Sequence, residues 1–508
     1  MMKATGSNRR YRLALVAVMV ALVVAVSFVQ PSLNRARADL GLTQVTPLEN
    51  APPILAFTTV ALGGFRGIIA NALWIRANEL EEKGKYFEAV QLADWITKLQ
   101  PRMVQVWTVQ AWNMAYNISV KFPSHADRWR WVKAGVELLR DEGLVYNPDE
   151  ALIYRELAWF FQHKIGHYLD AAHIYYKTQW AEEMRAVLGR DQPEWDALID
   201  PQTEEARARA RTLREVYKMD PVLMKELDDK YGPLEWKLPE THAIYWATVG
   251  LEHATDQDNK DTLRRVVYQC MDVAFNRGRL TYIGSEPFIG PNLEIAEKAN
   301  QAYLDMLALE NQPLEQSNGY RNFLRKVVYH HYSHARTREA EKWWNELKRI
   351  FPDAVRAGLS IDDYAVEMVS EDVSGTDQNK TISAIEGQVN NALLAIALGD
   401  EERMEAHLAL SVRIWNRYMN AAGCFEDPPD PDCVRIQLPA YDVMVRTMID
   451  AILDPESPLS PEARGRILTA LNLPADYNPR TARGTNAPSL NLTVPIEETT
   501  PPPQTSRE

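Results

Sequence analysis

The chain has 508 residues, a length that suits two to four globular domains or one long array of helical repeats. Its net charge is −13, although residues 1–12 contain Lys3 and three arginines and no acid. An acidic body repels phosphate backbones, so we expect no nucleic-acid partner. Glycine is scarce and no long run alternates polar with apolar residues, which predicts an all-α fold.

The first apolar segment runs from Leu13 to Val29 without a charge or a proline. Its length predicts a transmembrane anchor over residues 13–30 that contacts the lipid bilayer. Because arginines precede it, the positive-inside rule places residues 1–12 in the cytoplasm and the body outside the cytoplasmic (inner) membrane, for instance in the periplasm. A signal peptide cleaved after Ala38 is the alternative, and both interpretations export the body.

Residues 31–53 follow as a proline-containing linker. The next segment, 54–75, is again mostly apolar, but it contains Arg66, which would be costly in lipid. It is therefore interpreted as a buried or membrane-surface helix, with a second membrane crossing left open as the alternative.

Residues 73–101 predict a pair of helices. Apolar residues recur at helical spacing on both sides of Gly84, and Pro101 ends the second helix. With its Gly, Tyr, Ala and Pro in register, the stretch resembles one tetratricopeptide (TPR) repeat. Such a pair needs stacked neighbours to bury its apolar face.

Further stretches resemble the same repeat, most clearly 151–187 and 321–352, and Trp246, Val249, Gly250 and His253 follow the spacing of its first helix. The resemblance implies an irregular TPR-like α-solenoid of antiparallel helix pairs over residues 54–472. Segment 278–291 is predicted to be a Gly/Pro loop. Residues 473–508 are rich in Pro and Thr and are predicted to be a disordered tail.

The resemblance also implies a partner-binding groove lined by the first helices of the repeats. In that register it assigns seven residues to the groove: Trp74, Asn78, Trp112, Tyr116, Arg155, Trp159 and His163. Aromatic and arginine side chains make good contact anchors where they are exposed. The same aromatic residues at helical spacing can instead form core, and the sequence leaves both interpretations open.

Several other groups of polar residues are interpreted as structural rather than catalytic or metal-binding. His163, His167 and His173 cluster, as do His330, His331 and His334, but we expect no metal and no cofactor. Glu240 and His242 begin a helix and suit its first turn, although such a pair can do acid–base work. Cys424 and Cys433 enclose an acidic loop and are the candidate disulfide of an exported body.

These features predict a membrane-anchored, non-catalytic scaffold that docks protein partners of a cell-envelope assembly. No catalytic motif of a common enzyme class occurs in the chain, and we expect no small-molecule ligand. Two alternatives stay open: a module that binds envelope polysaccharide or peptidoglycan, and a helical glycan-active hydrolase or lyase.

Overall fold

The computed structural model describes residues 6–39, 66–283, 286–355, 358–370, 378–426, 437–457 and 459–481. The chain divides into two compact units. Unit 1 comprises Met1–Ile75 with Lys98–Gln100, and unit 2 comprises Arg76–Thr97 with Pro101–Glu508.

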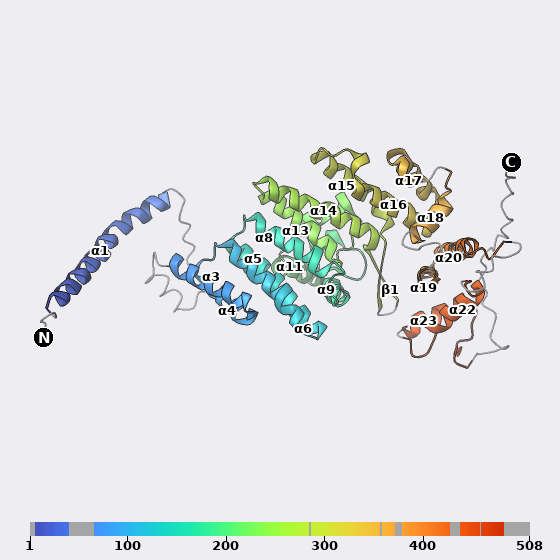
Figure 1. Ribbon diagram of the computed structural model, residues 1–508, viewed down its shortest axis with the longest axis horizontal. Coiled ribbons are helices and arrows are strands. Elements are labelled where there is room, and N and C mark those ends of the chain that lie inside the picture. The colour runs from blue at the N-terminus through green and yellow to red at the C-terminus, as the bar shows by residue number, and fades with distance from the viewer. Residues whose placement is uncertain are drawn as a thin grey trace. The chain divides into compact units, whose positions relative to one another are not determined.

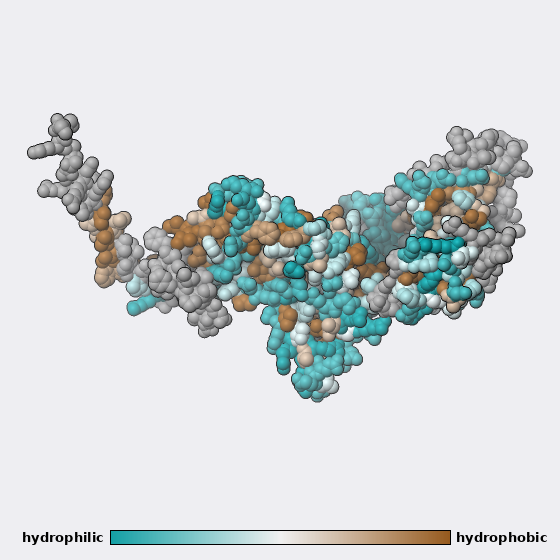
Figure 2. Space-filling view, turned by 90° about the horizontal axis from the view of Figure 1, so that it is seen from below, coloured by the Kyte–Doolittle hydropathy of each residue, from teal (hydrophilic) through white to brown (hydrophobic). Residues whose placement is uncertain are grey.

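Unit 1 contains helix α1, Gly6–Asp39, and the first part of α3, Arg66–Glu82. The linker predicted at 31–53 is helical as far as Asp39. Apolar side chains of α1, such as Leu22 and Phe28, are exposed. Figure 2 shows a brown, hydrophobic stretch in this N-terminal part of the chain. None of the helices in the part of the chain described above has both the length and the apolar character needed to span a bilayer. The transmembrane anchor predicted at 13–30 is therefore not confirmed.

Unit 2 is built almost entirely of helices, which confirms the all-α prediction (Figure 1). Its α-helices are α4 Tyr86–Leu99, α5 Val104–Trp112, α6 His125–Glu137, α7 Leu144–Tyr146, α8 Ala151–Trp159, α9 His173–Leu188, α10 Trp195–Ile199, α11 Glu204–Glu215, α12 Pro221–Tyr231, α13 Pro239–His253, α14 Gln257–Arg277, α15 Ala296–Leu309, α16 Asn318–Ser333, α17 Thr337–Ile350, α18 Ile361–Ser370, α19 Gln378–Leu398, α20 Glu401–Ala421, α22 Tyr441–Ile452 and α23 Pro461–Ala470. Short 3-10 helices lie at Ser119–Lys121 (η3), Leu293–Ile295 (η6), Leu314–Gln316 (η7) and Pro352–Ala354 (η8).

Local sequence signals explain where many of these helices begin and end. The side chains of Ser124, Asp256 and Ser317 accept hydrogen bonds from the first turns of α6, α14 and α16. Gly84, between α3 and α4, has a φ of 71°, a conformation that glycine adopts without strain. Consecutive helices pack together, as in the pairs α13–α14, α16–α17 and α19–α20, which is consistent with a helical repeat.

Among the described residues of unit 2, three helices contain a π-helical segment, which the repeat pattern does not predict. These segments are η2 Asn113–Ile118, η4 Leu138–Gly143 and η5 Phe160–Ile165, each of which directly continues an α-helix. A π-helical turn accommodates an extra residue and rotates the side chains that follow it. Positions beyond these turns therefore leave the register of a regular repeat.

Within the predicted loop 278–291, residues 279–283 and 286–290 form two paired strands. Strand β1, Arg279–Ile283, pairs antiparallel with β2, Glu286–Gly290. Leu280 is buried against Ala181 and Leu238, and Tyr282 packs on the same cluster. The alternation of Leu280 and Tyr282 along β1 is the strand signal, but it is too short to stand out beside the surrounding glycines.

Besides the small cluster around Leu280, the described residues of unit 2 form two large hydrophobic cores. The larger, which we call the main core, runs from Val104 to Tyr364, and the smaller, the C-terminal core, runs from Ala365 to Tyr477. Helix α18 contributes to both, with Tyr364 in the first and Ala365 in the second.

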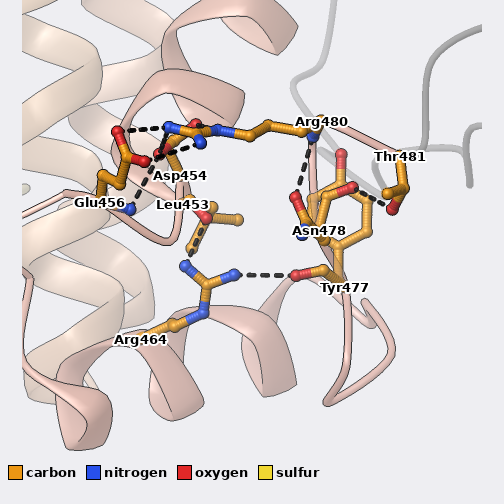
Figure 3. Close-up of polar contacts among 8 residues, drawn as sticks. All are labelled: Leu453, Asp454, Glu456, Arg464, Tyr477, Asn478, Arg480 and Thr481. Carbon is orange, nitrogen blue, oxygen red and sulfur yellow. Dashed lines mark hydrogen bonds and ion pairs between the residues drawn. The ribbon is translucent and has the colours of Figure 1, made fainter.

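The C-terminal core is closed by residues 471–481, which were predicted in part to be tail. Leu473 and Tyr477 are buried, so the packed body extends beyond residue 472. Arg480 donates to Asp454 Oδ2 at 2.7 Å and to Glu456 Oε1 at 2.9 Å (Figure 3). Arg464 donates to the carbonyl oxygens of Leu453 and Tyr477. Residues 482–508 of the predicted tail lie outside the described residues.

Candidate functional site

The strongest candidate site is a row of aromatic side chains on two neighbouring helical segments of unit 2. We call it the aromatic ladder and define it as Trp112, Tyr116, Trp159, His163, His167 and Tyr168. The first two lie on α5 and η2, the next two on α8 and η5, and the last two just after η5. Four of these residues come from the predicted groove.

The rings of the ladder form a nearly continuous stack. Ring centroids lie 4.2 Å apart between Trp112 and Tyr116, and 5.9 Å apart between Tyr116 and His163. His163 also stacks on His167, with ring centroids 5.6 Å apart, and His167 stacks on Tyr168, with centroids 4.3 Å apart. Trp159 stacks on His163, with ring centroids 4.6 Å apart and an angle of 9° between the ring planes. Such contacts stabilise each pair beyond the area that it buries.

Polar contacts fix the orientation of the rings. Trp112 Nε1 donates to Glu156 Oε2 at 2.6 Å, and Tyr116 Oη lies 3.2 Å from His163 Nδ1. Burial lowers the pKa of His163, and the nearby His167 and Lys164 lower it further, so the imidazole is neutral at pH 7. Burial likewise raises the pKa of Tyr116 well above its usual value. The ladder is thus held by neutral rings at its centre.

A buried ion pair supports the ladder from inside. Lys164 Nζ lies 4.9 Å from the Tyr116 ring centroid and donates to Asp170 Oδ2 at 2.6 Å. Burial lowers the pKa of Lys164, although the hydrogen bond and charge of Asp170 oppose that shift. Phe160, which is fully buried, makes T-shaped ring contacts with Trp112 and Tyr116.

Arg155 lies at the edge of the ladder. Its Nη1 donates to Asn259 Oδ1 on α14 at 2.8 Å, and its Nη2 lies 3.5 Å from Glu156, the residue that accepts from Trp112. The surface at the ladder therefore combines aromatic rings with the cation Arg155 and the carboxylate Glu156. Trp112 is 37% and Tyr168 59% exposed, so both ends of the ladder reach solvent.

The two remaining predicted groove residues, Trp74 and Asn78, lie one helical turn apart on α3 and are not members of the ladder. Trp74, in unit 1, is half-buried, and Asn78, in unit 2, is exposed. Sequence reasoning missed Glu156, His167 and Tyr168. Glu156 on α8 accepts a hydrogen bond from Trp112 on α5, and the π-helical turn η5 brings His167 beside His163. A regular repeat pattern predicts neither of these contacts.

The histidine clusters are not arranged as metal sites: within the described ranges, no three His, Cys, Asp or Glu side chains are placed to hold a metal ion. His167 belongs to the ladder, and His173 Nδ1 is buried without a hydrogen-bond partner. His330 lies 3.2 Å from Asn276 Oδ1, and His331 is buried. His334 contacts the ring of His407.

Glu240 and His242 are enclosed in the main core rather than in a cleft. Glu240 is 4% and His242 0% exposed. His242 Nε2 lies 2.8 Å from the carbonyl oxygen of Trp236, and the imidazole packs against Phe161 and Trp180. Burial raises the pKa of Glu240 and lowers that of His242 to about 4. The low pKa keeps His242 neutral at pH 7, and both side chains are buried among the packed helices.

The cysteines differ in state. Cys424 is disulfide-bonded, whereas Cys270 is a free thiol buried in α14. Cys433, its predicted partner, lies outside the described residues, so the pairing of the two stays a prediction.

Comparison of the chain with models of known protein families and with curated proteins gives no match. The helical architecture is consistent with a repeat protein, and the tetratricopeptide resemblance remains a prediction.

Proposed function

We propose that this chain is a non-catalytic docking protein that binds protein partners of a cell-envelope assembly through the aromatic ladder. The observation that carries the proposal is the ladder itself: rigid, half-exposed rings with Arg155 and Glu156 at their edge. Protein interfaces concentrate their binding energy in such aromatic and arginine anchors, surrounded by polar groups that set orientation. Because the rings are already ordered, little side-chain entropy is lost on binding.

The packing of the rings favours a protein over a glycan partner. Sugars stack on a free aromatic face, but within the ladder most faces are covered by a neighbouring ring. Tyr116 covers one face of Trp112, and Trp159 stacks on His163. Trp112 and Tyr168, the two exposed rings, each have one face stacked on a neighbouring ring, so a partner can reach only their edges and their other face.

The envelope location is part of the proposal. Residues 13–30 would tether the body to the cytoplasmic membrane with residues 1–12 inside, which raises the local concentration of the body for membrane-bound partners. The disulfide at Cys424 supports an oxidising compartment outside the cytoplasm. Membrane fractionation with carbonate extraction tests the tether: release of the full-length chain into the soluble fraction would refute it.

The docking proposal is tested by crosslinking the full-length protein in membranes and identifying captured proteins by mass spectrometry. Trp112→Ala with Tyr168→Ala removes both exposed ends of the ladder and should abolish capture of a specific envelope protein. Trp95, on α4, is 52% exposed and lies outside the ladder, so Trp95→Ala is the matched control. Equal loss in the control, or full capture by the double variant, would refute the ladder as the docking surface.

A further inference from the structure

The joint between the two cores of unit 2 differs from the cores themselves because it is rich in polar groups. It lies where α16 meets α20, and Tyr329 and Tyr332 of α16 pack against the C-terminal core. Figure 1 shows α19 to α23 grouped beside α16 to α18. On one side of the joint, Arg413 of α20 binds Tyr332 and Asp362.

The other side of the joint is a histidine cluster. His330 and His334 lie at the end of α16 and His407 on α20, with ring centroids 6.4 Å apart between the first two and 5.7 Å between His334 and His407. His407 Nδ1 lies 2.9 Å from Gln388 Oε1, and His334 Nδ1 lies 2.9 Å from the carbonyl oxygen of His330. A carbonyl oxygen can only accept a hydrogen bond, so the Nδ1 atoms of His334 and His407 carry the proton of each neutral ring.

The second nitrogen of His334 and that of His407 have no hydrogen-bond partner. His334 Nε2 and His407 Nε2 are buried without a hydrogen bond, as is Nε of the neighbouring Arg403. A buried polar atom that has lost water and gained nothing destabilises the contact that buries it. Three such atoms therefore weaken the closed joint selectively, and opening it would return all three to water.

The charges around the cluster oppose its protonation. Lys326 of α16, Arg403 of α20 and, beside Arg403, Arg279 of β1 are cations. Asp272 of α14 is held by Lys326 at 3.0 Å, and Asp400 caps the first turn of α20. Asp362 of α18 is bound by Arg413. Gln388 of α19 and Asn276 of α14 face the rings as neutral groups.

We propose that this joint is a proton-triggered hinge, which opens in mild acid so that α20 and the C-terminal core separate from α16. Burial, reinforced by these cations, lowers the pKa of His330 to about 4, of His334 to about 2 and of His407 to about 3. Hydrated imidazoles have a pKa near 6.5, so between that pH and these values the open joint binds protons that the closed joint does not. Opening therefore becomes about tenfold more favourable per pH unit for each of the three rings.

Hydroxyl-radical labelling of buried side chains in the full chain, followed from pH 6.5 to 4.5, measures the opening, because separating the helices exposes side chains but leaves the hydrogen bonds within each helix intact. Labelling of the α20 side chains at the joint should show a dependence of about three protons, whereas labelling of α11, which contains no histidine, should show little. His334→Asn with His407→Asn keeps a donor in the Nδ1 position and removes two titrating rings. The double variant should retain a dependence of about one proton.

His125 is exposed on α6, so His125→Asn is the matched control and should behave as the wild type. If the double variant does not fold, the His407→Asn variant should lose about one proton of the dependence, and the contrast between α20 and α11 in the wild type remains decisive. The hinge is overturned by an α20 dependence that the substitutions leave unchanged, or by an acid response that is equal in α11 and α20.

Discussion

Gly250 gives the sharpest test of how the helices of the main core pack. It lies in α13, where a Cβ atom would come within 2.9 Å of Tyr154 Cβ on α8 and within 3.1 Å of Leu263 Cδ2 on α14. Tyr154 Cβ is fixed to its backbone, so Gly250→Ala must push α8 and α13 apart. Overpacking of this kind costs about 1–3 kcal/mol, and the better helix propensity of alanine returns about 1 kcal/mol. We expect a net destabilisation of up to about 2 kcal/mol.

Gly387, in α19, provides the matched control because it is exposed and a Cβ there would meet nothing within 4 Å. Gly387→Ala should therefore stabilise α19 by about 1 kcal/mol through helix propensity alone. Native-state hydrogen exchange measures the two helices separately, which avoids assuming that both cores unfold together. A Gly250→Ala protein whose α13 amides are as protected as those of the wild type, or more so, would refute the close-packing argument.

Two further outcomes follow from buried titratable groups of the main core. Burial lowers the pKa of His242 to about 4 in the folded state, whereas the unfolded chain binds a proton at this residue below about pH 6.5. The contribution of His242 should therefore lower the free energy of unfolding by about 1.4 kcal/mol for each pH unit as the pH falls from about 6.5 to about 4. In denaturant titrations His242→Gln should make this dependence on pH less steep, and an unchanged dependence would contradict the assignment. Burial raises the pKa of the Cys270 thiol well above its usual value, so iodoacetamide should modify Cys270 only when the chain is unfolded, and rapid alkylation of the folded protein would show that the thiol is accessible.

Much of the helical framework could be predicted because its signals are local. The turn at Gly84, the prolines that begin α12, α13 and α23, and the side-chain caps of α6 and α14 each act within one helical turn. Apolar spacing then identifies the buried face, as with Ala93 and Ile96 of α4.

The remaining features depend on contacts that are distant in sequence. The π-helical turns η2 and η5 decide which rings of the ladder meet, and the hydrogen bond from Trp112 to Glu156 spans two helices. The hairpin β1–β2 is fixed by packing of Leu280 on Ala181 and Leu238. Local propensity does not encode such contacts, so the sequence predicted four members of the ladder but not their arrangement.

Because residues 471–481 close the C-terminal core, the position at which the chain is truncated matters for the fragment that results. A fragment that stops at residue 472, the boundary that composition suggests, would lack Leu473, Tyr477 and Arg480. It would expose the apolar side chains beneath Tyr477 and leave Asp454 and Glu456 without the guanidinium that lies between them. Such a fragment is prone to associate through the uncovered patch, whereas one that keeps Thr481 retains a closed C-terminal core.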